Sequence, residues 1–216
     1  MVDVGTRRRR RRRRRVRQRI AAAAERYAEM GWPVVAGAHP VGVACSCDRV
    51  GCPAPGAHPL SAAWQLQATV DVPTVRDWWT SWPDANVLLV TGRVFDVLDV
   101  PAQAGRIALA GLGTGAPCGP VAACGPDRLL FFTTTRGAPA DEDEWWSCHL
   151  DCVPDSVADT PGLRWHCRES YVLAPPSRHV SGEQVHWVRP PQEHRLRDPM
   201  LLLPVLAEAC EDAGAP

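Results

Sequence analysis

Apolar residues recur along the chain at the spacings of short helices and strands. In the first periodic stretch they fall three or four positions apart, the spacing of one helix face. Its members are Ile20, Ala24, Tyr27 and Met30, and Gly31 followed by Pro33 ends it. This pattern predicts a helix of about 13 residues that starts near Arg17. Helical patterns also cover residues 71–83, 102–112 and 199–209.

Short apolar runs of strand length fill much of the remaining chain. Residues 86–90 and 95–100 are separated by Thr91-Gly92-Arg93, and we expect them to be adjacent buried strands. Residues 121–124 and 129–134 flank a Gly-Pro-Asp turn, which predicts a hairpin. Further strands are expected at residues 33–38, 163–166, 171–174 and 185–188. This order of elements predicts an α+β domain with a mixed β-sheet flanked by helices.

Charge is distributed unevenly, although the formal net charge of the 216-residue chain is zero. Nine adjacent guanidinium groups repel one another and bury nothing, so residues 1–16 are predicted to form a disordered arm. Such an arm would bind the phosphates of DNA or RNA without sequence preference and with a steep salt dependence; a solvated tail is the alternative. The run comprises Arg7, Arg8, Arg9, Arg10, Arg11, Arg12, Arg13, Arg14 and Arg15.

The chain length is sufficient for one sizeable core. No apolar run approaches the roughly 18 residues that a membrane span needs. The arginine run is followed by four alanines and then Glu25, so it lacks the apolar region of a secretory signal. We therefore expect a cytoplasmic protein that binds no membrane, in which the nine Cys residues are thiols or metal ligands.

The loop at residues 39–60 carries the strongest chemical signal, CSCDRVGCPAPGAH. Cys45, Cys47, Cys52 and His58 supply four nitrogen and sulfur donors in a short segment, which is typical of a structural Zn²⁺ site. A surface loop with free thiols is the alternative. The later Cys and His residues, His166 among them, have irregular spacing and are interpreted as ordinary buried or surface residues.

Several segments together resemble one family. In chain order they are ERYAEMGWPVV, the Cys/His loop ending in AHPL, VRDWWTSWPDANVLLVTGR, DVLDV, DRLLFF and YVLAPPSRHVSGEQVHW. They resemble the N-terminal domain of bifunctional DNA primase/polymerases, a branch of the archaeo-eukaryotic primase superfamily. The resemblance implies an RRM-like catalytic sheet that joins nucleotides by using two divalent ions about 4 Å apart. Beside the arm at 1–16, which the arginine run predicts, the chain is thus divided into a primase/polymerase-like domain at 17–190 and a C-terminal helix and tail at 191–216.

The resemblance also implies a set of metal ligands, and this chain departs from it. The family has an Asp-x-Asp or Asp-x-Glu pair at a strand end, a third Asp on a later strand, and a hairpin His that contacts the triphosphate. Here the pair falls on Asp99 and Pro101, the third acid on Arg164, and the His on Leu129. Asp96 is an odd number of positions from Asp99 and would face the other side of the strand. A single carboxylate holds Mg²⁺ or Mn²⁺ weakly, so Asp99 is predicted to be vestigial.

A cleft without metals could still bind a nucleoside triphosphate or a nucleic-acid strand. The candidate contacts are Arg128, Arg164, Ser177, Arg178 and His179, although a hydrogen-bonded turn would explain Ser177 and His179 equally well. The sequence thus predicts a catalytically degenerate module that acts in replication with a partner such as a helicase supplied in trans. Two alternatives remain. One is an active primase-polymerase that uses Asp99 with Glu169 or Asp127, and the other is a regulatory domain that binds a protein through its acidic surface.

Overall fold

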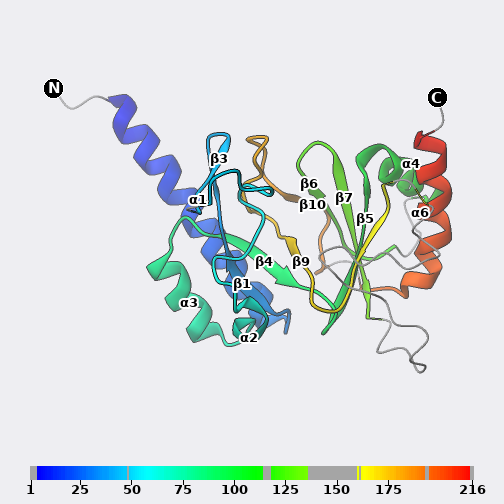
Figure 1. The fold of residues 1–216 in the computed structure, drawn as a ribbon, viewed down its shortest axis with the longest axis horizontal. Helices are drawn as coiled ribbons and strands as arrows, with labels where there is room; N and C mark the ends of the chain where they lie inside the picture. The colour runs from blue at the N-terminus through cyan, green and yellow to red at the C-terminus, as the bar shows by residue number, and fades with distance from the viewer. Residues whose placement is uncertain are drawn as a thin grey trace.

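The computed structural model describes residues 4–47, 49–113, 118–135, 160, 162–192 and 195–214. Within them, the strands form two larger antiparallel sheets and one small hairpin (Figure 1). The three-stranded sheet has the order β1 (Val34–Gly37), β4 (Asn86–Val90), β9 (Tyr171–Leu173). The five-stranded sheet has the order β10 (His186–Arg189), β6 (Val121–Cys124), β7 (Arg128–Thr134), β5 (Phe95–Pro101), β8 (Arg164–His166). The hairpin consists of β2 (Pro40–Val41) and β3 (Ala44–Cys45).

The longer helices are divided between the two larger sheets. Helices α1 (Val4–Glu29) and α3 (Val72–Ser81) pack beside the three-stranded sheet, and the short α2 (Trp64–Gln67) precedes α3 (Figure 1). Helices α4 (Ala102–Leu112) and α6 (Pro199–Gly214) pack on each other and on the five-stranded sheet. In the part of the chain that the structure describes, no helix has both the length and the apolar character needed to cross a bilayer.

The α+β class and the separate Cys/His loop are confirmed. The sheet differs from the prediction, because the strands are divided between antiparallel sheets instead of forming one mixed sheet. Tight turns account for part of this difference. β6 and β7, for example, are joined by residues 125–127, a connection too short for parallel neighbours.

The expectation that residues 86–90 and 95–100 form neighbouring strands is wrong. Both segments are strands, but β4 pairs with β1 and β9, whereas β5 pairs with β7 and β8. The chain changes sheets at Gly92, which has a φ of +78°. A Cβ at this position would lie 2.2 Å from the Cα of Arg168, so the turn requires glycine for its backbone angle and for close packing.

Helix α1 is much longer than predicted. It spans 26 residues and includes the arginine run, so the predicted disordered arm is wrong for residues 4–16, while residues 1–3 lie outside the described part. No Gly or Pro interrupts the sequence between Thr6 and Glu29, and arginine is a good helix former. Ile20 and Tyr27 anchor the C-terminal half of the helix in the core. The helix therefore carries the exposed arginines outward from a fixed base.

Asp84, in the turn after α3, ties the arginine-rich half of α1 to the domain. Its Oδ2 lies 2.6 Å from Nη2 of Arg13, and its Oδ1 accepts a hydrogen bond of 2.9 Å from Nε of Arg17. Arg178 approaches the same carboxylate at 3.6 Å. The hydrogen bonds from Arg17, partly opposed by burial and reinforced by Arg13, hold the pKa of Asp84 well below its usual range. Asp84 is thus charged at neutral pH and neutralises part of a strongly cationic helix.

We expect Asp84→Asn to lower the free energy of unfolding by about 1–2 kcal/mol, between the values of exposed and buried ion pairs. A carboxyl group with a depressed pKa stabilises the fold fully above its unfolded-state pKa near 3.8, and this stabilisation is lost progressively as the pH falls from there through the lower folded-state pKa. Urea unfolding between pH 7 and pH 3 should therefore show the difference between the two proteins beginning to shrink at the acid end. Asp77→Asn, on the exposed face of α3, is the matched control and should change little. Equal losses in both variants would contradict the anchoring role.

Candidate functional site

Asp99 lies near the end of β5, which has a neighbouring strand on each side. The register pairs Asp99 with Leu130 on β7 and with Arg164 on β8. Directly opposed residues in antiparallel strands share a face of the sheet. Because side chains alternate along a strand, Arg128 and His166 lie on this face as well. The position opposite Asp99, where the family resemblance implies the third acid, is therefore occupied by an arginine.

The registers also correct one assignment made from the sequence. Leu129, onto which the hairpin His was aligned, pairs with Val100 and packs in the cluster beneath α4 and α6. It points away from Asp99, so no residue at that position could contact a ligand beside Asp99. On β7 the residues that share the face of Asp99 are Arg128 and Leu130, and neither is a histidine.

The side chains of Arg128 and His166 contact the carboxylate of Asp99. Nε of Arg128 donates to Oδ1 at 2.7 Å, and Nε2 of His166 lies 3.4 Å from Oδ2. Nη2 of Arg128 also donates to the backbone oxygens of Asp99 and Gly162, at 3.0 and 2.8 Å. Nδ1 of His166 lies 3.0 Å from Oγ of Ser170, which fixes the ring. The interpretation of His166 as an ordinary residue therefore missed a direct partner of Asp99.

Burial and charge have opposite effects on Asp99, which is only 5% exposed. Burial alone would raise the pKa of its carboxyl group, but the hydrogen bond from His166 and the charges of His166 and Arg128 outweigh it and leave the pKa lowered. The anion is thus stable inside the protein because its partners come from the protein itself.

The other acids proposed as metal ligands do not converge on Asp99. Asp96 lies on the opposite face, where its Oδ2 accepts a hydrogen bond of 3.3 Å from Nε1 of Trp165. Glu169 follows the end of β8 near Val97, whereas Asp127 precedes Arg128 at the other end of β5. Among the described residues, only the Cys/His loop brings together three or more potential metal-binding side chains. These residues do not fit a two-ion centre at Asp99.

Three of the predicted nucleotide or nucleic-acid contacts have structural partners. Arg128 forms an ion pair with Asp99, and Arg178 forms one with Asp84. The side chain of Asn86 also donates to the carbonyl of Arg178 and accepts from its amide. Oγ of the buried Ser177 accepts from the amide of Val87 and donates to its carbonyl, which ties the segment after β9 to β4.

Arg164 and His179 are more accessible. Arg164 is exposed, and no described residue forms an ion pair with it. His179 is half-buried, with Nδ1 2.9 Å from Oγ of Ser181. Its ring covers Gly125 in the β6–β7 turn, where an added Cβ would lie 2.6 Å from the ring. The loop that follows β9 therefore packs against the hairpin next to Asp99, and ligand contacts by these residues stay predictions.

The Cys/His loop forms a compact donor cluster around β2 and β3. The ligand atoms of Cys45, Cys47, Cys52 and His58 all lie within 4.8 Å of one another. Sγ of Cys45 is 3.3 Å from Nε2 of His58, whose Nδ1 lies 2.8 Å from the carbonyl oxygen of Pro59. Although desolvation opposes it, hydrogen bonding by the Cys47 and Gly56 amides and by His58 lowers the pKa of Cys45 to about 6. The lowered pKa favours the thiolate form of Cys45, which is the form that binds metal ions. The four side chains together can therefore hold a metal ion.

The fold and these two sites define an α+β domain of the primase/polymerase type, with a carboxylate near the end of a central strand and an appended Cys/His loop. A family model described as bifunctional DNA primase/polymerase, N-terminal, matches residues 24–204, and the chain belongs to this family. No curated protein matches the chain. The match extends past the predicted domain boundary at residue 190 and leaves the arginine run of α1 outside.

Replacing Asp99 should reveal whether its carboxylate stabilises the fold. Acids gathered for metal ions repel one another, so neutralising one of them generally raises stability. Here Asp99→Asn leaves the partly buried guanidinium of Arg128 and the buried ring of His166 without their anionic partner, and we expect it to lower the free energy of unfolding by roughly 1–3 kcal/mol. Chemical denaturation measures this change, and Asp127→Asn, at an exposed turn, is the matched control. An increase in stability in Asp99→Asn would indicate an uncompensated carboxylate.

Proposed function

We propose that this protein is a nucleic-acid-binding module built on the primase/polymerase fold that does not itself join nucleotides. One observation carries the proposal: Arg128 and His166 already bind the carboxylate of Asp99. Its neighbours at the family's metal-ligand positions are Pro101 and Arg164, which supply no carboxylate.

Electrostatics explains why this arrangement disfavours catalysis. Nucleotidyl transfer by two ions needs several carboxylates, because two divalent cations about 4 Å apart repel each other strongly. At Asp99 a cation would meet the guanidinium groups of Arg128 and, across the strand, Arg164, with one negative charge to offset them. Mg²⁺ also gives up its waters reluctantly and needs near-ideal oxygen geometry. The Arg128 contact would have to break before an ion could approach.

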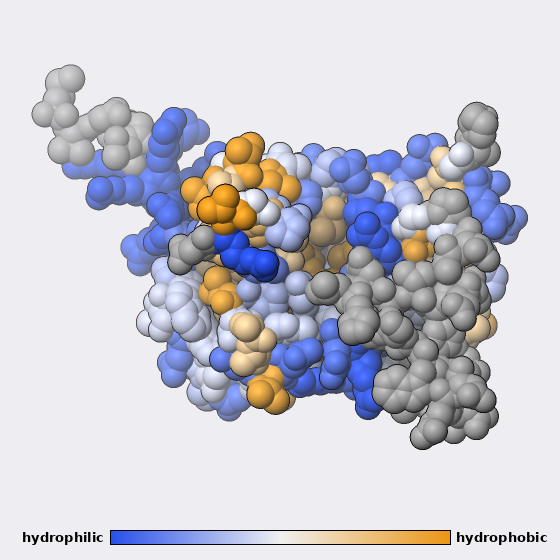
Figure 2. Space-filling view, in the orientation of Figure 1, coloured by the Kyte–Doolittle hydropathy of each residue, from blue (hydrophilic) through white to orange (hydrophobic). Residues whose placement is uncertain are grey.

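The same balance of charge favours a polyanion as the partner. The arginine run lies on the exposed surface of α1, which forms a strongly hydrophilic projection in Figure 2. Arginine side chains bind phosphates well, and the release of counterions drives such binding without sequence preference. A role in cytoplasmic replication would then depend on catalytic partners, such as a helicase or polymerase, supplied in trans.

We further propose that the Cys/His loop holds a structural zinc ion. Three thiols and one imidazole form the donor set that Zn²⁺ prefers, and four protein ligands leave no position open for catalysis. The loop has little apolar core of its own, since Val43 and Val50 are almost fully exposed, and Figure 2 shows apolar surface gathered over this loop. A bound ion would supply the cross-links that side-chain burial does not.

Primer extension tests the proposed loss of catalysis. With a primed template, all four nucleotides and either Mg²⁺ or Mn²⁺, we expect no extension by the full chain. An active polymerase under the same conditions is the positive control. Titration of free Mn²⁺, followed by its electron paramagnetic resonance signal, should show no tight binding. Extension that Asp99→Ala abolishes would instead support an active enzyme with displaced acids such as Glu169 or Asp127.

Metal analysis tests the zinc proposal. Purified protein should contain about one zinc ion per chain, as one four-ligand site requires. A chelator or the Cys47→Ser/Cys52→Ser double substitution should remove the ion and lower the melting temperature by several degrees. Cys124→Ser, which replaces a thiol in the five-stranded sheet, is the control and should retain the ion. Metal-free protein with unchanged thermal stability would contradict a structural ion.

A further inference from the structure

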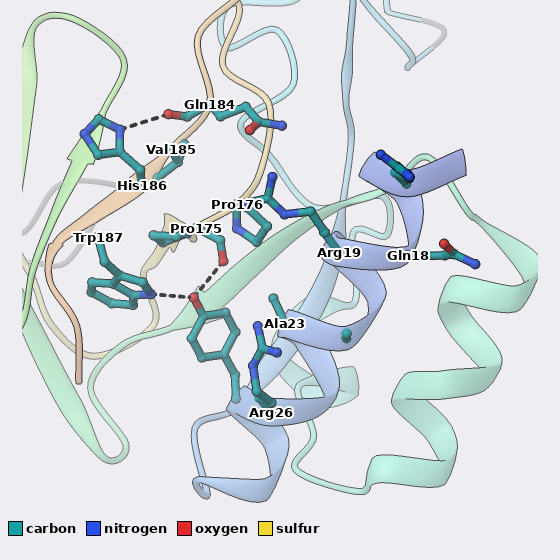
Figure 3. A pocket seen from close by; sticks show the side chains of 13 residues that line it. Gln18, Arg19, Ala23, Arg26, Pro175, Pro176, Gln184, Val185, His186 and Trp187 are labelled. Carbon is teal, nitrogen blue, oxygen red and sulfur yellow. Dashed lines mark hydrogen bonds between the residues drawn. The ribbon is translucent and has the colours of Figure 1, made fainter. Parts of the chain in front are cut away.

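A groove of about 630 Å³ lies between α1 and the segment that leads into β10 (Figure 3). We call it the α1–β10 groove; residues of α1 from Arg15 to Tyr27 form one wall, and residues 175–176 and 184–187 form the other. Asp99, Arg128 and His166 are not among its lining residues. It is therefore a separate site from the one at the end of β5.

The wall formed by α1 is cationic. Arg15, Arg19 and Arg26 all line the groove, and all three are exposed. Arg15 and Arg19 are about one helical turn apart and Arg26 lies about two turns further, so the cations extend over roughly 16 Å of the helix. None of the lining residues is acidic. Arg13 and Arg17, which do pair with an acid, contact Asp84. The groove therefore retains its positive charge.

The opposite wall offers flat, largely apolar side chains. Pro175, Pro176, His186 and Trp187 lie there (Figure 3), and both Pro175 and Trp187 contact the hydroxyl of Tyr27. That hydroxyl donates to the carbonyl of Pro175 at 2.6 Å and accepts from Nε1 of Trp187 at 3.0 Å. The ring of Trp187 is further held by Phe132, with centroids 5.0 Å apart. These contacts hold the wall in place before any ligand binds, which reduces the entropy cost of binding.

We propose that the α1–β10 groove binds a single strand of DNA or RNA, with phosphates on the arginine wall and bases against Trp187, the prolines and His186. This inference rests on the proposed nucleic-acid binding and gives it a location. A single strand presents charged phosphates and open base faces together, and proteins bind it through a cationic track combined with stacking surfaces. In a duplex the base faces are stacked inside the helix, so only one wall of the groove would be used.

A matched pair of double variants tests the location. Arg15→Gln/Arg19→Gln removes two cations from the groove, whereas Arg8→Gln/Arg12→Gln removes two with the same spacing from the exposed helix surface outside it. Fluorescence anisotropy with an oligothymidylate of about six nucleotides, near the lower end of single-strand site sizes, measures both. We expect the groove variant to weaken binding on the order of tenfold and to reduce the salt slope by about 1.4, or 0.7 for each lost phosphate contact. The surface variant should change the affinity and the salt slope much less.

Two further ligands test the role of the bases. An abasic strand with the same number of phosphates should bind several-fold more weakly than oligothymidylate, because stacking is lost. A glutamate peptide of equal charge should compete poorly for the same reason. Equal binding by either ligand would overturn the single-strand assignment in favour of a general anion site.

The results separate this inference from the proposal on which it rests. If the unaltered protein binds no nucleic acid at low salt, the proposed function fails. If it binds, but both double variants weaken binding equally, the proposed function stands and the groove assignment fails. Circular dichroism should show the same helix content in all variants, because the four replaced arginines are exposed and glutamine is a good helix former.

Discussion

The contact between Arg128 and Asp99 determines what the end of the five-stranded sheet can do. A buried carboxylate needs compensating charge and hydrogen bonds, and a protein can take these from a bound metal ion or from its own side chains. Here Arg128 reaches Oδ1 of Asp99 and two backbone oxygens with one guanidinium, while His166 covers Oδ2. Both oxygens of the carboxylate therefore have partners within the protein. The strand position characteristic of the family is therefore retained as part of the architecture.

A second aspartate has a similar role at the opposite side of the molecule. Asp84 gathers Arg13 and Arg17 of α1 together with Arg178 of the loop after β9. These contacts hold a helix whose other arginines repel one another, and they orient it so that Arg15 and Arg19 face the groove instead of the acid. Together with the buried residues Ile20 and Tyr27, this anion holds α1 in the orientation that points Arg15 and Arg19 at the groove. The α1–β10 groove depends on this orientation as much as on its own lining.

Local patterns in the sequence predicted a large part of the fold. The helix predicted from residue 71 is an example, since its start at Asp71, whose Oδ2 accepts from the amide of Thr74, depends on residues only three positions apart. The β6–β7 hairpin and the Cys/His cluster likewise depend on short segments. Apart from the helical arginine run of α1, the errors concern contacts between distant residues: Asp84 lies 67 positions from Arg17, and Asp99 lies 67 positions from His166. No local pattern shows that β4 and β5 enter different sheets, because that depends on which partners each strand finds.

The electrostatic character of the candidate sites is consistent throughout. Beside Asp99, the cations Arg128 and Arg164 outnumber the single anion, so the end of β5 attracts negative charge where a two-ion centre would attract metal. The α1–β10 groove adds three more cations with no acid among them. Arginines at both places therefore support the proposal that the domain binds a polyanion and does not activate one.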